Sequence, residues 1–272
     1  MLGGDDSGAT AEALAGRGPT PPEIAGALAT QSRVIVALVL RETLSRYGQH
    51  KLGFLWALLE PVLMVLLFAG IMSSFRSGDP GGMPLVLFMI TGFVPYMMVR
   101  DTMSQMQGAI VSNRTLIGFP QVTTFDLILA RAVLECAVLA LVFPLILGLA
   151  HVVLGQSVHV ENPLGVLAAL LLLAALVPVI PSLRQISAVA LGRPLFFASG
   201  LFFTAGSMPE PLRGWLLYNP VLHMIELLRS EFFVEFESPY GDWYYASLWA
   251  FGTLAFGMLV HQAVRRRAIV GL

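Results

Sequence analysis

The amino-acid sequence predicts an all-α polytopic membrane protein with six transmembrane helices. Three observations carry this prediction. Of the 272 residues, 56% are hydrophobic and 12% are charged, whereas a soluble domain carries about a quarter charged residues. Apolar stretches of about 20 residues, long enough to cross a bilayer, recur along the chain. The basic residues gather in connections that an even number of spans places on one side of the membrane.

The N-terminal region is expected to be a tail followed by a surface helix. Residues 1–30 contain Gly, Ala, Pro, Thr and acidic residues without periodicity, which is typical of a disordered tail. Over residues 31–51 the pattern is helical, and Arg41 and Arg46 oppose an apolar stripe. We expect an amphipathic interface helix with its cations toward headgroups and water; an ordinary cytosolic helix is the alternative. The apolar stripe consists of Ala37, Leu40, Leu44 and Tyr47.

A transmembrane domain over residues 52–265 is predicted to hold the six spans, and a basic tail over 265–272 follows it. The spans are expected at residues 52–75, 84–110, 125–150, 164–180, 188–206 and 243–260. Because six is an even number, both termini lie on one side, which the positive-inside rule makes cytoplasmic. The basic residues on this side are Arg33, Arg41, Arg46, Lys51, Arg114, Arg184, Arg265, Arg266 and Arg267.

Prolines break the chain between the fifth and the sixth span, namely Pro209, Pro211 and Pro220. A proline cannot continue a regular helix, and charged side chains such as Glu226 are costly in hydrocarbon. We therefore expect residues 207–237 to form short re-entrant helices that meet at Asn219-Pro220. Broken helices at membrane depth occur where they are buried in protein or line an aqueous cavity. We interpret this segment as a periplasmic gate.

The second half of this segment is amphipathic. Its apolar stripe consists of Val221, Ile225, Leu228 and Phe232. His223 and Glu226 fall near the opposite side, which we expect to meet water and sugar. Trp215 and Tyr218 are aromatic candidates for stacking on sugars. The full set of candidates for the pore or the gate is Arg100, Arg193, Trp215, Tyr218, Asn219, His223 and Glu226.

Charged residues inside the predicted spans have two interpretations. Hydrocarbon tolerates them where they are paired or face a cavity. An ion pair between Arg131 and Glu135, four residues apart on one helix, is the purely structural interpretation. Arg193 lies one turn inside a span, where it either lines the pore or extends to the interface. The charged residues concerned are Glu60, Arg100, Asp101, Arg131 and Glu135.

The sequence contains no motif of an ATPase or of a metal enzyme. Gly-x-x-x-x-Gly-Lys-Ser/Thr is absent, and the only lysine, Lys51, is followed by leucine. Cys136 is the only cysteine, and the five histidines show no ligand spacing. We expect no catalytic residue, metal or cofactor in this chain. Energy from ATP would then come from another subunit.

Five motifs together resemble a known family. They are Leu40-Arg41-Glu42-Thr43, Gly53-Phe54-Leu55-Trp56-Ala57-Leu58-Leu59-Glu60-Pro61, Asn113-Arg114-Thr115-Leu116-Ile117, Arg193-Pro194-Leu195-Phe196-Phe197-Ala198-Ser199-Gly200 and Tyr218-Asn219-Pro220-Val221-Leu222-His223-Met224-Ile225-Glu226-Leu227-Leu228-Arg229. Over residues 33 to 270 the chain resembles the membrane subunit of bacterial polysaccharide ABC exporters, in particular the KpsM-like capsular polysaccharide export permeases. The family's longer polar segment between the fourth and fifth spans is reduced here to Pro181-Ser182-Leu183-Arg184-Gln185, so we assign it no coupling role.

The resemblance implies a homodimer in the bacterial inner membrane, docked on two ATPase subunits that bind ATP and Mg. It further implies export of a lipid-linked capsular polysaccharide, with a periplasmic copolymerase and an outer-membrane channel as partners and no nucleic acid. Exporters of O-antigen or teichoic acid share this architecture and stay open as alternatives. In another class, a lipid-modifying membrane enzyme would use Asp101, Glu135 and Arg100, but no compact acid/base or metal motif supports it.

Two sets of residues are expected to serve the transport cycle. The short polar connection from Asn113 to Gln121 joins two spans and is the natural entry point for ATP-driven motion. Its ATPase-coupling candidates are Asn113, Arg114, Leu116, Phe119 and Gln121, of which Leu116 and Phe119 would fill a groove on the ATPase. Arg41 and Arg46 are expected to border the entrance for the lipid-linked substrate, because cations near the surface attract anionic headgroups.

Overall fold

The structure is a computed structural model that describes residues 21–47, 53–75, 78–113, 116, 122–176 and 193–270. Its described residues form helices and no strands, which confirms the all-α class. The helices are α2 (Pro21–Tyr47), α3 (Gly53–Phe75), α4 (Leu85–Ser112), α5 (Thr124–Leu154), α6 (Pro163–Ala175), α8 (Arg193–Ala198), α9 (Glu210–Leu216), α10 (Pro220–Phe232) and α11 (Trp243–Val270). Two short 3-10 turns, η1 (Pro80–Gly82) and η5 (Ala205–Ser207), lie between them.

Among the described residues, four helices are long and apolar enough to cross a membrane, and they occupy four of the six expected spans. They cover Leu55–Phe75, Leu85–Met106, Thr124–Leu154 and Trp243–Val260. At the fourth expected span, the apolar helix α6 covers Pro163–Ala175. Residues 177–192, which contain the end of that span and the start of the fifth, lie outside the described residues.

The fifth expected span, 188–206, is not one continuous helix where the structure describes it. α8 ends at Ala198, and the chain then bends through Gly200, whose φ is +75°. Glycine adopts this left-handed conformation without the steric cost of a Cβ. The apolar composition of this stretch therefore marks burial within the protein rather than a regular crossing.

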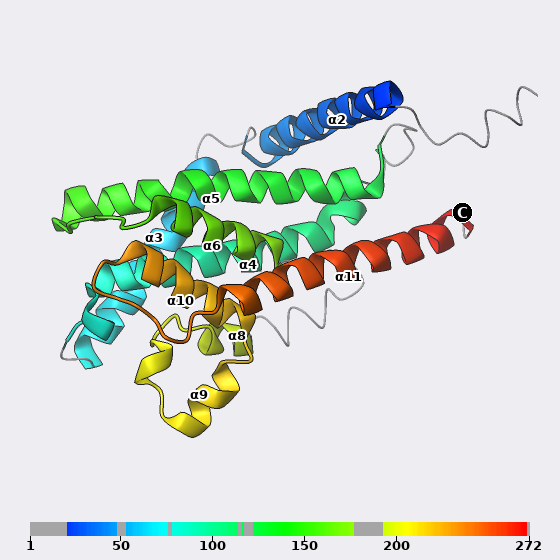
Figure 1. The fold of residues 1–272 in the computed structure, drawn as a ribbon. Coiled ribbons are helices and arrows are strands. Elements are labelled where there is room, and N and C mark those ends of the chain that lie inside the picture. Colours follow the sequence, from blue (N-terminus) through cyan, green and yellow to red (C-terminus); the bar gives the residue numbers. More distant parts are fainter. Residues whose placement is uncertain are drawn as a thin grey trace, which may run out of the picture.

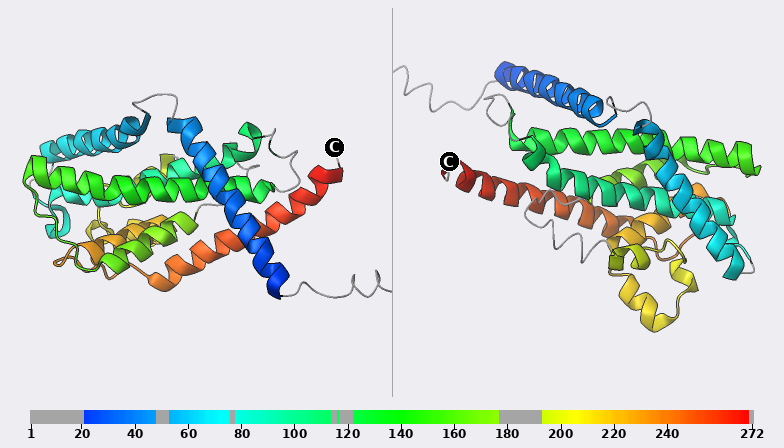
Figure 2. Two further views of the ribbon diagram at one scale, coloured as in Figure 1. Left: turned by 90° about the horizontal axis from the view of Figure 1, so that it is seen from above. Right: turned by 180° about the vertical axis from the view of Figure 1, so that it is seen from behind.

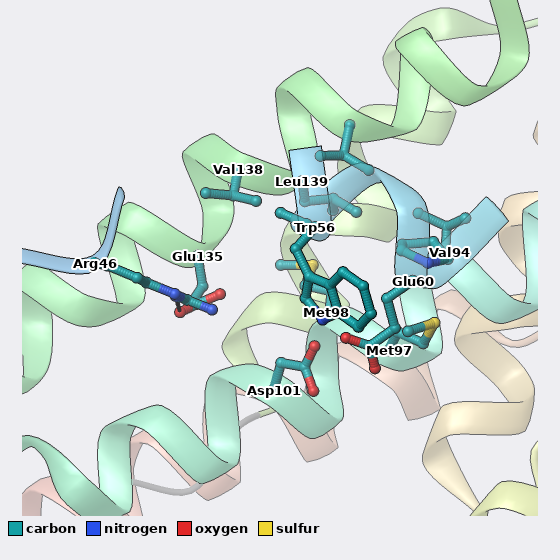
Figure 3. Close-up of a pocket in the computed structure, with 13 residues that line it drawn as sticks. Arg46, Trp56, Glu60, Val94, Met97, Met98, Asp101, Glu135, Val138 and Leu139 are labelled. Atoms are coloured by element: carbon teal, nitrogen blue, oxygen red, sulfur yellow. Dashed lines mark hydrogen bonds and ion pairs between the residues drawn. The ribbon is translucent and has the colours of Figure 1, made fainter. Parts of the chain in front are cut away.

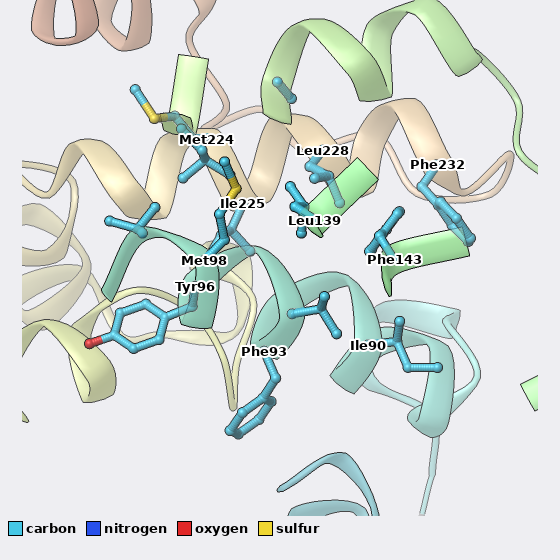
Figure 4. Close-up of a cluster of buried hydrophobic side chains, with 14 of the residues drawn as sticks. Ile90, Phe93, Tyr96, Met98, Leu139, Phe143, Met224, Ile225, Leu228 and Phe232 are labelled. Atoms are coloured by element: carbon cyan, nitrogen blue, oxygen red, sulfur yellow. The ribbon is translucent and has the colours of Figure 1, made fainter. Parts of the chain in front are cut away.

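The buried core lies where α4 packs against α5 and α10 (Figure 1). α4 is the most enclosed of the four long apolar helices, and Phe88 and Phe93 have no exposed surface. Figure 4 shows side chains of α4, α5 and α10 meeting in this core, among them Phe143, Ile225 and Leu228. α4 is thus the central helix on which the other elements are placed.

Helix α2 lies outside this bundle and crosses over α5 (Figure 2). It begins at Pro21, so residues 21–30 are helical rather than part of the expected tail. Two prolines stand at its start, where the missing N–H is not needed. The C-terminal end of α11 lies at the end of the bundle where α4 leads to α5 (Figure 1). That this end is cytoplasmic stays a prediction.

Candidate functional site

Polar side chains connect α2 to α5 and to the end of α4. Gln31 Nε2 donates to Asp126 Oδ1 at 3.0 Å. Arg131 Nη2 lies 2.7 Å from Glu42 Oε1, and Arg46 forms an ion pair with Glu135. Because residues four apart share a helix face, Glu42 and Arg46 on α2 meet Arg131 and Glu135 on α5 as two cross-helix pairs.

These contacts correct two expectations. Arg131 and Glu135 do not pair with each other, as their spacing on one helix allowed, but each pairs with a charge on α2. The cations of α2 do not all face outward either, because Arg46 points to Glu135, while Leu40 and Leu44 of the apolar stripe are exposed. The physical reason is that the buried charges of α5 need partners, and Glu42 and Arg46 of α2 supply the opposite charges.

Arg131 ties three elements together. Its guanidinium donates to the carbonyl oxygen of Gln105 at 2.7 Å and to Ser112 Oγ at 2.7 Å, in addition to its bridge to Glu42. Arg41 of α2 reaches the same end of α4, where its Nη1 donates to Asn113 Oδ1 at 2.7 Å. The start of α5 is also fixed, because Thr123 and Asp126 form a reciprocal capping box. The chain around Asn113 is therefore held from two sides.

The structure locates two of the five ATPase-coupling candidates. Asn113 is buried and bonded to Arg41. Leu116 is partly buried and packs against the small cluster of Leu38, Leu127 and Ala130; its fit to a groove on the ATPase stays a prediction. Arg114, Phe119 and Gln121 lie outside the described residues.

A pocket of about 310 Å³ lies between α3, α4 and α5, beside the end of α2 (Figure 3). Charged residues and an indole line one part of it, and apolar residues line the rest. Its lining includes Arg46, Trp56, Glu60, Asp101 and Glu135 together with Val94, Met97, Met98, Val138, Leu139 and Val142. At its edge, Arg100 donates to Glu60 Oε1 at 2.9 Å and to Asp101 Oδ1 at 2.8 Å. Of the five charged residues expected inside spans, Glu60, Asp101 and Glu135 line this pocket and Arg100 contacts two of them, whereas Arg131 lies outside the lining.

Two charged residues of α10 are buried, which corrects the expectation that its polar side meets water. Glu226 is 1% exposed, and Arg229 has no exposed surface. Glu226 accepts a hydrogen bond of 3.0 Å from the backbone N–H of Ala205 and another from the Ser238 hydroxyl. His223 is also buried, and its Nε2 lies 2.8 Å from the carbonyl oxygen of Leu217.

Arg229 binds the backbone where the fifth expected span is broken. Its Nη1 donates to the carbonyl oxygen of Gly200 at 2.7 Å, and its Nη2 donates to that of Phe88 at 3.2 Å. Its guanidinium also lies over the Phe88 ring, 3.7 Å from the centroid. Removal from water lowers the pKa of Arg229 to about 10, so the side chain stays charged at neutral pH. Arg229 and Glu226 thus supply the hydrogen bonds that a regular helix would make internally.

Arg229 and Trp56 were not among the predicted site residues, although the sequence carries a signal for the position of each. Arg229 continues the four-residue spacing of Val221 and Ile225 and so falls on the buried stripe. Trp56 precedes Glu60 by one helical turn, which places the indole and the carboxylate on the same face of α3. In both cases helical spacing indicates the face of the helix on which the residue lies, whereas the residues it contacts depend on how the helices pack.

The predicted gate segment contains two short helices that meet at Asn219-Pro220, as expected. Asn219 caps α10, and its Nδ2 donates to the carbonyl oxygen of Ala198 at 3.1 Å. Trp215 and Tyr218, on and just after α9, are 77% and 73% exposed. Arg193 is the first residue of α8, and its side chain lies outside the described part. No group of three or more metal-ligating side chains occurs among the described residues.

Comparison with known proteins gives one family match and several relatives. Residues 33–233 match the family described as ABC-2 type transporter. The polysialic acid transport protein KpsM of Escherichia coli is 27% identical to this chain over a region that covers 85% of this chain and 93% of the length of KpsM. The capsule polysaccharide export inner-membrane protein CtrC of Neisseria meningitidis serogroup A is 30% identical over 86% and 91% of the two chains. The corresponding protein BexB of Haemophilus influenzae is 30% identical over 76% and 81%.

Proposed function

The chain belongs to the ABC-2 type transporter family, and from this we propose that it is the membrane permease of an exporter of lipid-linked capsular polysaccharide. The exporter would work across the bacterial inner membrane. The observation that carries the proposal is the likeness to three proteins named for polysialic acid transport or capsule polysaccharide export, over at least 76% of this chain.

The working unit in this proposal is a homodimer with two ATPase subunits. The sequence has no phosphate-binding loop of the Gly-Lys-Ser/Thr type, so ATP and Mg belong to the partner. The described part of one copy offers four helices long enough to span, which are few for enclosing a polymer channel. A periplasmic copolymerase and an outer-membrane channel would carry the polymer onward.

We propose that ATP-driven motion enters at residues 113–121 and passes to α2 and α5. Support comes from the bonds of Arg41 to Asn113 and of Arg131 to both Ser112 and Glu42. Through them, a push at the end of α4 would reach the helix that borders the pocket. Cysteines at Thr115 or Gln121 should crosslink to the ATPase; failure at both positions in an intact complex would relocate the coupling site.

Substrate would enter beside Arg46 and leave through the gate formed by residues 207–237. Arg46 belongs to the pocket lining, which supports a place on the substrate's route. Trp215 and Tyr218 are exposed, so they can contact a polymer or a second copy of the chain. Arg100 is bridged to Glu60 and Asp101, which gives it a structural role alongside any contact with substrate.

The proposal is tested in a capsule-forming bacterium whose own permease gene is deleted. The chain is expressed with the ATPase encoded by its native host, and surface capsule is measured with an antibody or a capsule-specific phage. A tagged copy is purified from the same membranes. Restored capsule together with a co-purifying ATPase is expected. A co-purifying ATPase with export of O-antigen or teichoic acid instead would change the substrate, and an intact protein without any ATPase would refute the exporter.

A further inference from the structure

We propose that the pocket between α3, α4 and α5 binds a neutral sugar ring of the lipid-linked substrate, with Trp56 stacking on the ring and Glu60 and Asp101 accepting its hydroxyls. This inference rests on the proposed function and adds the chemistry of recognition to it. It concerns the pocket lining described above.

The indole of Trp56 is placed as a binding platform rather than as core. It is 62% exposed, although it borders a cavity in the bundle. Figure 3 shows the ring beside Glu60, with Asp101 nearby. The face of an aromatic ring carries partial negative charge, which attracts the weakly positive C–H groups on one side of a pyranose. Because most of the indole surface is not covered by the described part of the chain, one face can contact a ligand.

The carboxylates of Glu60 and Asp101 can accept hydrogen bonds from ligand hydroxyl groups without losing their bonds to Arg100. Arg100 contacts Glu60 through Oε1 and Asp101 through Oδ1. An ionised carboxylate offers about four acceptor sites, so each keeps capacity for a ligand hydroxyl. Arg100 also fixes the position of both groups, since it bridges α4 to α3. Positioned acceptors at the edge of a mainly apolar cavity are typical of small-molecule sites.

The charge of the lining favours a neutral ligand over an anion. Three carboxylates, Glu60, Asp101 and Glu135, line the pocket, and two cations contact them, Arg46 in the lining and Arg100 at the edge. Arg46 is itself paired with Glu135. A phosphate or sialic carboxylate placed here would meet more negative than positive charge, which raises its free energy in a site of low dielectric constant. Sugar hydroxyls, which donate hydrogen bonds, match this lining.

Size and position fit one sugar unit close to its lipid. Pockets for small ligands measure about 300 to 1000 Å³, and this one measures about 310 Å³. Its inner wall is apolar, formed by residues such as Val94, Met97 and Leu139. The pocket borders Arg46 at the end of α2, on the side where entry is proposed. A sugar near the lipid end of the substrate would thus be held while the lipid lies in the bilayer.

The test measures binding of octyl β-D-glucoside, below its micelle concentration, to the complex with its ATPase in nanodiscs free of glycolipid. Octyl phosphate is the anionic probe, and an octyl tetraethylene glycol ether is the neutral probe without sugar. We expect saturable binding of the glucoside alone. Trp56→Ala should raise its Kd about five- to tenfold, as loss of one stacking contact does, and Trp56→Phe should restore part of the affinity. Glu60→Gln with Asp101→Asn should also weaken binding.

Trp249→Ala, which removes another exposed aromatic residue, is the matched control and should leave the Kd unchanged. Because Trp56 is largely exposed, its replacement leaves no internal cavity, and equal melting temperatures check this. An unchanged Kd in Trp56→Ala, equal binding of the glycol ether, or preference for octyl phosphate would overturn the inference. Restored capsule with no glucoside binding would refute this site alone, whereas glucoside binding with neither capsule nor ATPase would refute the proposed function alone.

Discussion

Arg41 Nη1 donates a hydrogen bond of 2.7 Å to Asn113 Oδ1, joining α2 to the residue that directly follows α4. The bond links a residue predicted for substrate entry to one predicted for ATPase coupling. If it transmits motion, the two predicted roles describe one mechanical connection rather than two separate sites.

Arg41→Ala should reduce export several-fold while the ATPase stays bound. The variant loses one hydrogen bond to a charged group, worth about 1.5 to 3 kcal/mol, and frees α2 from Asn113. Arg33→Ala is the control, since Arg33 is an exposed arginine of the same helix. Export and co-purified ATPase are measured together. Equal export by the two variants would show that the bond transmits nothing.

Exchanging the charges of Arg46 and Glu135 should test whether their pair is structural. Arg46→Glu alone places a second carboxylate beside the buried Glu135 and should lower both stability and export. Arg46→Glu with Glu135→Arg should recover most of the stability, because interaction energies of about 0.5 to 3 kcal/mol are usual for residues in contact. Thermal unfolding in detergent gives the double-mutant cycle. Recovery of stability without recovery of export would assign Arg46 a role in entry as well.

Gly92→Ala should destabilise the protein by about 1 to 3 kcal/mol, the usual cost of overpacking. A Cβ at Gly92 would lie 2.6 Å from Nη2 of Arg229, and the guanidinium has no room to move without losing its carbonyl partners. Gly148→Ala is the control in another long helix, where a Cβ meets nothing within 4 Å. Alanine favours the helix there by up to about 1 kcal/mol. Equal melting temperatures for the two variants would contradict the close contact.

Trp215→Ala and Tyr218→Ala should impair export more than folding. Both side chains are largely exposed, and exposed substitutions usually change stability by less than about 0.5 kcal/mol. A disulfide scan with single cysteines from Met208 to Met224, in a Cys136→Ser background, tests the gate itself. Crosslinks between two copies that block export are expected. An intact dimer without a symmetric crosslink anywhere in this window would place the segment at the periphery.

Hydropathy and proline positions predicted the elements that depend on local sequence. The spans that became α3, α4, α5 and α11 follow from their apolar length, and the break at Asn219-Pro220 follows from proline geometry and an asparagine cap. These features are decided within one or two helical turns. They are therefore readable without knowledge of the fold.

The residues with which the buried charges pair could not be predicted in the same way. The spacing of Arg131 and Glu135 permitted a pair within α5, and only the docking of α2 offered better partners. The periodicity of α2 predicted one apolar and one polar face. It did not predict that the polar face packs against α5. Glu226 was expected to face water because it is charged. In the structure its carboxylate instead accepts a hydrogen bond from the backbone N–H of Ala205, where the chain is not helical. In each case a distant segment decided the outcome.

The buried guanidinium of Arg229 imposes an order of assembly on the growing chain. Its partners are carbonyl oxygens of Gly200 and of Phe88, and Phe88 belongs to a helix made long before it. Until α4 is inserted, α10 would carry an unpaired cation into a non-aqueous site, at a cost of several kcal/mol. The segment from Arg193 to Phe232 must therefore dock late, onto a helix already in the bilayer. The N-terminal half of the molecule thus acts as the template on which the C-terminal half is completed.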